Sequence, residues 1–64
     1  MPFPARLTAL RESAGLSIPG LAAKAGISDD AIRCYESGKR APSWEMVQKL
    51  ATALGVSTDS FRTA

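Results

Sequence analysis

The sequence predicts an all-α fold of five short helices that form a single domain over residues 1–64. Apolar residues recur at spacings of three and four, as one face of a helix requires, and no stretch shows the alternation typical of a strand. In addition, LAAKAGIS at residues 21–28 is echoed by LATALGVS at residues 50–57. Each segment has the pattern of a helix end, a glycine for the left-handed position, a β-branched residue and a serine cap.

The first two helices are expected over residues 4–14 and 17–25. Gly15 ends the first helix, whose apolar face consists of Phe3, Leu7, Leu10 and Ala14. Ser17 caps the second helix. Pro19 is tolerated in the first turn of that helix, because the N–H group that it lacks would have no partner there.

The remaining helices are expected over residues 28–37, 43–54 and 58–62, and Ser28 and Ser43 cap the first two of these. The loop SGKRAP separates the third helix from the fourth. Apolar residues mark the inward faces: Ile32 and Tyr35 on the third helix, Val47, Leu50, Ala51 and Leu54 on the fourth, and Phe61 on the last turn.

Composition excludes several classes of protein. The chain has no histidine and a single cysteine, Cys34, so neither an internal disulfide nor a Cys/His metal site is expected. No nucleophile and base stand at a recognisable spacing, which argues against an enzyme, a cofactor or a small-molecule substrate. The N-terminus lacks the apolar region of a signal peptide, and no apolar run could cross a membrane. We therefore expect a cytoplasmic protein, and its formal net charge of +2 is compatible with a polyanionic partner.

The second and third helices are joined by Ala25-Gly26-Ile27, a short glycine-containing connection typical of a helix-turn-helix. In such a pair the second helix can lie in the major groove of DNA, while the start of the first meets the phosphate backbone.

Five runs together resemble the phage repressor/Cro type, or XRE-like, helix-turn-helix family over about residues 5–62: RESAGLS, LAAKAGIS, Ile32, YESGKRAP and LATALGVS. The resemblance implies a compact five-helix lambda-repressor-like DNA-binding domain whose recognition helix is 28–37. It further implies a transcriptional repressor of prokaryotic or phage type, which binds double-stranded DNA as a possible homodimer on a two-fold operator. Arg11 and Glu36 match positions that the family joins in a structural ion pair.

The outward face of the third helix holds the candidate base contacts. The resemblance places such contacts at Asp29, Asp30 and Cys34, and Arg33 could donate to O6 and N7 of guanine. The two acids depart from the family pattern, since an aspartate can accept from cytosine N4 but repels phosphates. Three interpretations stay open for them: cytosine readout, recognition of something other than DNA, or stabilisation of the helix start, with Asp29 pairing with Arg33.

The candidate contacts to the DNA backbone are Ser17, at the amide-rich start of the second helix, and the loop cations Lys39 and Arg40. Ile18 stands where the family usually has a glutamine that bonds a phosphate. Trp44 is expected at the edge of the core or in a dimer contact. The alternative function is a protein-interaction module on the same fold, an antitoxin or adaptor, whose acidic face and Ile18 contact a protein.

Overall fold

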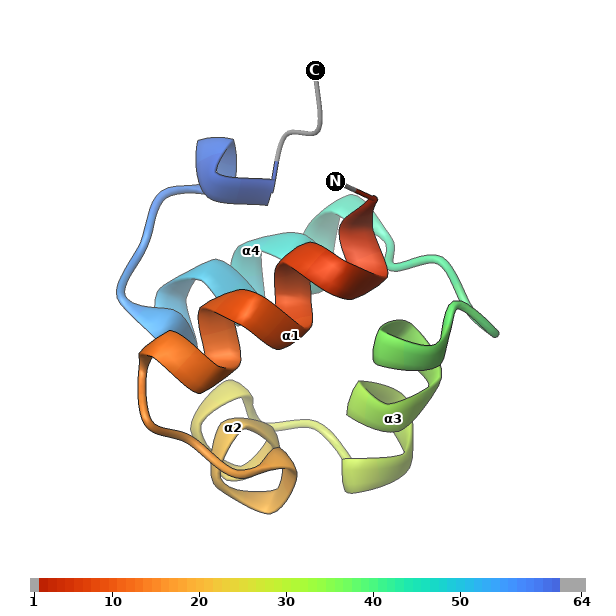
Figure 1. Ribbon diagram of the computed structural model, residues 1–64, viewed down its shortest axis with the longest axis horizontal. Coiled ribbons are helices and arrows are strands. Elements are labelled where there is room, and N and C mark those ends of the chain that lie inside the picture. Colours follow the sequence, from red (N-terminus) through yellow and green to blue (C-terminus); the bar gives the residue numbers. More distant parts are fainter. Residues whose placement is uncertain (1, 62–64) are drawn as a thin grey trace.

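The computed structural model describes residues 2–61, which form four α-helices and one turn of 3₁₀ helix (Figure 1). The elements, in chain order, are α1 Phe3–Ser13, α2 Ile18–Ala25, α3 Asp29–Ser37, α4 Trp44–Leu54 and η1 Thr58–Phe61. The all-α class is confirmed, and the described residues contain no strand. The count of five α-helices is wrong, because the last segment has the tighter 3₁₀ geometry that is common in such short pieces. Arg62, expected in that segment, lies outside the described residues.

Serine side chains start three of the helices. The hydroxyl oxygen accepts a hydrogen bond from the amide three residues later at Ser17 (3.0 Å), Ser28 (3.2 Å) and Ser43 (3.2 Å). Each serine has an extended backbone, so the helix proper begins one residue after the predicted start. The first helix is also displaced by one residue, since Pro2 precedes it and the exposed Ala14 follows its end. Ala14 therefore does not extend the apolar face.

The two echoed segments end their helices in the same way. Gly26 and Gly55 adopt φ angles of 73° and 72°, and the following Ile27 and Val56 each donate a backbone hydrogen bond of 3.0 Å to a carbonyl five residues earlier. The segments differ at their serines. Ser28 caps α3 through its side chain, whereas Ser57 accepts from the Ser60 amide through its backbone carbonyl at 3.1 Å.

A small apolar core joins all five elements. α1 packs against α3, α2 packs against both α3 and α4, and η1 packs against α4 and α1. The rings of Phe3 and Phe61 lie 5.2 Å apart and close the core on the side of η1. The inner faces of α2 and α3 are therefore held against the body while their outer faces remain available. The buried apolar residues are Leu7, Leu21, Ala22, Ile32, Tyr35, Leu50, Ala51 and Phe61.

None of the helices within residues 2–61 has the length and apolar character needed to cross a membrane.

Candidate nucleic-acid interface

The interface is built on α2, α3 and the turn between them. α2 ends at Ala25, Gly26 reverses the chain with its left-handed backbone, and Ser28 caps α3. Ile27, between them, is half-buried and packs against the core. The turn is therefore anchored at its apolar residue, which fixes the direction in which α3 leaves α2.

α3 has one buried face and one open face. Ile32 and Tyr35 are buried, as predicted from their spacing. On the opposite face the side chain of Asp30 is 92% exposed and that of Arg33 is 57% exposed. Asp29 and Cys34 are half-buried, at the borders between the two faces. The residues named from the sequence as candidate base contacts thus differ strongly in exposure, and Asp30 and Arg33 extend furthest from the body.

The ion pair on this face joins Arg33 to Asp30 and not to Asp29. Arg33 Nη1 lies 3.5 Å from Asp30 Oδ1, three residues back along the helix. Residues three and four apart both neighbour each other on a helix surface, so spacing alone allowed either aspartate. The half-buried position of Asp29 leaves the exposed Asp30 as the partner of Arg33. The predicted pairing of Asp29 with Arg33 is wrong.

The outer face of α3 borders an open hollow of about 380 Å³. Ser37, which the sequence analysis did not single out, borders it too, and its hydroxyl donates a 3.2 Å hydrogen bond to the carbonyl of Cys34. Helical spacing could have found Ser37, because it stands four residues after Arg33 on the same side of the helix. The residues that line the hollow are Asp30, Arg33, Cys34, Ser37 and Lys39.

The start of α2 presents one backbone amide, that of Ile18, beside an exposed serine. The hydroxyl oxygen of Ser17 accepts from the amide of Gly20, so this serine closes the first turn. Gly20 is a second residue that the sequence analysis missed. A Cβ atom at this position would lie 3.1 Å from the hydroxyl oxygen of Ser17, so a larger residue would crowd the cap. Pro19 has no N–H group and the Gly20 amide is bonded to Ser17, so among the first residues of α2 the amide of Ile18 is the one left to meet an anion. Ile18 packs against the core.

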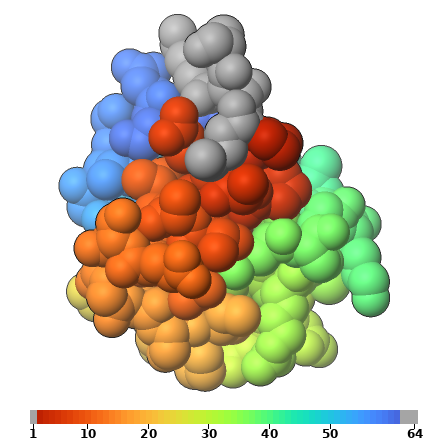
Figure 2. All heavy atoms as spheres, in the orientation of Figure 1, coloured from red at the N-terminus to blue at the C-terminus, as the bar shows by residue number. Residues whose placement is uncertain are grey.

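The loop after α3 folds back on the end of that helix. The amides of Lys39 and Arg40 both donate to the carbonyl of Cys34, at 3.0 Å and 3.4 Å, while their side chains are exposed. Figure 2 shows the green segment after α3 standing out at the edge of the molecule.

The exposed cations around α3 do not gather at one point. Lys39 borders the same hollow as Arg33, whereas Arg40 borders another beside Phe3 at the start of α1. Lys24 borders a third hollow, between α2 and α4. These three cations therefore lie at separate places on the surface.

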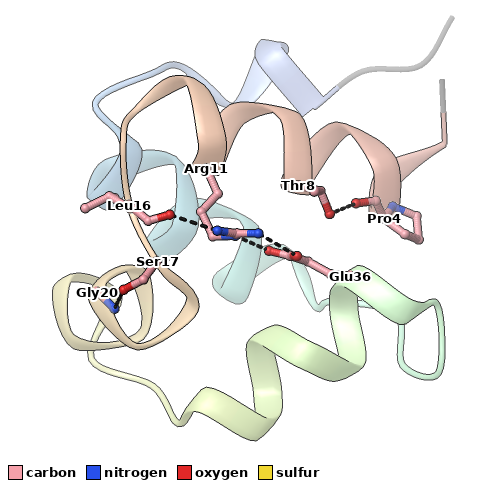
Figure 3. Close-up of polar contacts among 7 residues, drawn as sticks. All are labelled: Pro4, Thr8, Arg11, Leu16, Ser17, Gly20 and Glu36. Carbon is pink, nitrogen blue, oxygen red and sulfur yellow. Dashed lines mark hydrogen bonds and ion pairs between the residues drawn. The ribbon is translucent and has the colours of Figure 1, made fainter.

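One buried guanidinium connects the parts of this interface (Figure 3). Arg11 Nε lies 2.7 Å from Glu36 Oε2 and its Nη2 lies 3.3 Å from Oε1, so the two side chains face each other as a two-bonded pair. Their side chains are only 13% and 11% exposed. The third nitrogen, Nη1, donates to the carbonyl of Leu16 at 2.8 Å. Arg11 thus ties the end of α3 to the residue before the cap of α2.

The hydrogen bond to Glu36 is the main cause that raises the pKa of Arg11 above its ordinary value, and the negative charges of Glu36 and Glu12 raise it further. Burial acts in the opposite direction and is outweighed. The guanidinium therefore stays charged over the whole physiological pH range.

Trp44 lies outside the core. It is 63% exposed, the one large apolar residue of that kind among residues 2–61. Together with Phe3, Val47 and Phe61 it borders a hollow of about 250 Å³ between α4 and η1. An exposed tryptophan beside other apolar side chains is a common feature of protein contact surfaces.

Comparison with known proteins identifies the family. A family model described as a helix-turn-helix domain matches residues 3–64. Among solved structures, the restriction-modification controller protein C.AhdI from Aeromonas hydrophila superposes with a TM-score of 0.91 and is 35% identical. The match covers 94% of this chain and 91% of that one. The chain belongs to the Cro/XRE-type helix-turn-helix family. A search of curated proteins found no match.

Membership of the Cro/XRE-type family confirms the recognition made from the sequence. It also makes this protein a DNA-binding transcriptional regulator, in a family that is generally not enzymatic. The helix-turn-helix of this family is here α2, the turn at Gly26 and α3, with Arg11 and Glu36 beneath it.

Proposed function

We propose that this chain is a sequence-specific repressor that occupies a DNA operator and reads the major groove with α3. The observation that carries the proposal is the two-sided character of α3: its inner face is buried at Ile32 and Tyr35, while Asp30 and Arg33 stand out from the body. A helix held in this way can enter a groove about 12 Å wide without disturbing the core that supports it. No other helix combines this outward face with a preceding turn of helix-turn-helix type within the described residues.

Within this proposal the polar residues have distinct tasks. Arg33 donates to O6 and N7 of a guanine, and Cys34 packs against a neighbouring base edge. Asp30 stands beside Arg33 on the exposed side of α3, and the half-buried Asp29 stabilises the start of the helix. Ser17, Lys39 and Arg40 meet phosphates at either side of the groove. The contacts to base edges carry sequence preference, and the contacts to phosphates carry most of the affinity.

The likeness to a restriction-modification controller protein supports a setting in which this chain controls the transcription of such a system. We further propose that two copies occupy a two-fold operator, with Trp44 in the contact between them. The supporting observation is the exposure of Trp44 beside apolar Phe3 and Val47. A regulator of this kind works in the cytoplasm, where its operator lies.

The test is selection of binding sites from random duplex DNA at two salt concentrations, followed by a reporter with the selected site across its promoter. We expect a short sequence with two-fold symmetry to be enriched, binding to weaken steeply with salt, and transcription to fall. Enrichment of no sequence at either salt concentration would overturn the proposal. If a site is enriched but transcription of the reporter rises, the chain is an activator and not a repressor.

A protein-interaction function on the same fold is the second candidate, and one observation favours it. The side chain of Asp30 is 92% exposed on the face that should approach phosphates. If this face contacts a protein, random DNA should yield no selected site, while Asp30→Arg should abolish the protein contact and leave the fold intact.

A further inference from the structure

The ion pair with Arg33 on the exposed face of α3 gives Asp30 a role other than contact with a base. Asp30 Oδ1 lies 3.5 Å from Arg33 Nη1, and both side chains border the same open hollow. Asp29, the adjacent acid in the same first turn, is half-buried and forms no ion pair with any described residue. The two aspartates are thus alike in chemistry and place in the chain but different in their relation to Arg33.

An arginine that reads a base must give up a large amount of side-chain freedom when it binds. Asp30 has a short side chain on the capped first turn of α3, so it offers Arg33 a fixed point of negative charge. The contact uses Nη1 of the guanidinium. It leaves the Nε and Nη2 side of the group free, and that side has the two parallel donors which match O6 and N7 of guanine.

We propose that Asp30 is a positioning residue, which orients Arg33 toward a guanine and does not itself read a base. This inference rests on the proposed function, since it requires α3 to enter the major groove. It also explains how an acid can be tolerated there. In a groove from which water is excluded, the attraction between Asp30 and Arg33 strengthens and offsets part of the repulsion between Asp30 and the phosphates.

The experiment measures base discrimination, which a merely structural residue would not change at a single position. Selection with the wild type and with Arg33→Gln first identifies the guanine whose preference depends on Arg33. The ratio of dissociation constants for the best duplex and for the duplex with that guanine replaced is then measured for Asp30→Asn, Asp30→Glu and Asp29→Asn. Asp29→Asn is the matched control, because it removes the same charge from the same helix turn without an ion pair.

We expect Asp30→Asn to lower the discrimination at that guanine by about two- to fivefold, the range of exposed ion pairs. Asp30→Glu, which keeps a carboxylate within reach of Arg33, should restore most of it, and Asp29→Asn should leave it unchanged. In the Arg33→Gln background, Asp30→Asn should have no further effect on discrimination.

Two results would overturn the inference. An equal loss of discrimination in Asp29→Asn would show a general effect of charge in the first turn. A changed preference at a different base pair, persisting in the Arg33→Gln background, would show that Asp30 reads a base directly. Both differ from failure of the proposed function, in which the wild type selects no sequence and the inference fails with it.

Discussion

Arg11 in α1 and Glu36 in the last turn of α3 form a nearly buried ion pair with an Nε–Oε2 distance of 2.7 Å. The same guanidinium also donates to the carbonyl of Leu16, immediately before the cap of α2. The pair therefore lies under both helices of the helix-turn-helix and connects their supports. Since all three guanidinium nitrogens have protein acceptors, this buried charge is compensated, and it becomes costly only if one partner is removed.

Glu36→Gln should destabilise the domain strongly. The substitution keeps the size of the side chain but leaves the Arg11 charge buried without its partner, a change that typically costs about 3–5 kcal/mol. The free energy of unfolding from a urea or thermal melt measures the loss. A domain of this size has little stability to spare, so the variant should be largely unfolded at 37 °C.

Glu45→Gln is the control for this prediction. Glu45 lies 3.8 Å from Lys49 on α4, and its side chain is 80% exposed. The same chemical change should here alter the free energy of unfolding by less than about 1 kcal/mol, because exposed pairs contribute little. Equal losses in the two variants would show that burial does not determine the importance of the Arg11–Glu36 pair.

Ser17→Ala should separate helix capping from phosphate binding when it is compared with Ser43→Ala. Both serines accept one hydrogen bond from an amide in the first turn of their helix, so each substitution should cost about 1 kcal/mol of stability. Only Ser17 stands at the proposed phosphate contact. DNA affinity, measured where both variants are folded, should therefore fall for Ser17→Ala and stay at the wild-type value for Ser43→Ala. If the two variants bind DNA with equal affinity, Ser17 does not contact a phosphate.

Lys39→Ala and Arg40→Ala should each flatten the salt dependence of DNA binding. A cation that neutralises one phosphate contributes about 0.9 to the slope of log K against log salt concentration. The slope is measured by titrating a selected duplex at several salt concentrations. Lys49→Ala, which removes the same charge from the α4 surface, should leave it unchanged. If the slopes of all three variants match the wild type, the loop cations do not touch phosphates.

Trp44→Ala should weaken self-association and leave the monomer intact. The side chain is 63% exposed, so its removal takes little from the core. Sedimentation of the wild type over a range of concentrations should show a monomer–dimer equilibrium, which the substitution shifts toward the monomer. On a two-fold operator the variant should bind the two half-sites with less cooperativity. A wild type that stays monomeric both alone and on DNA would contradict the proposed contact.

Helix starts and ends were predictable because their causes are local. Ser17, Ser28 and Ser43 cap helices through bonds to amides three residues away, and Gly26 and Gly55 take the left-handed backbone that a glycine adopts without strain. The last turn was predicted less well. Its short length permits 3₁₀ as readily as α geometry, and the capping pattern at Ser57 did not lead to a side-chain bond.

The candidate interface was predictable only in part. Helical spacing separated the inner residues Ile32 and Tyr35 from the outer ones. It did not choose between Asp29 and Asp30 as the partner of Arg33, because both lie within one turn of it. Nor did it indicate that Lys39 shares a hollow with Arg33 while Arg40 borders another, since that depends on how the loop folds back on α3.

Periodicity, capping serines and left-handed glycines depend on neighbouring residues, and they were sufficient to predict the four α-helices and the turn between α2 and α3. The family was predicted from the resemblance of whole sequence runs such as YESGKRAP. Contacts between residues far apart in the chain were determined by packing. Arg11 and Glu36 are separated by 25 positions, and their distance depends on how α1 lies against α3. The same packing sets the exposure of each residue on α3, because a side chain is open or covered according to what the rest of the chain places beside it.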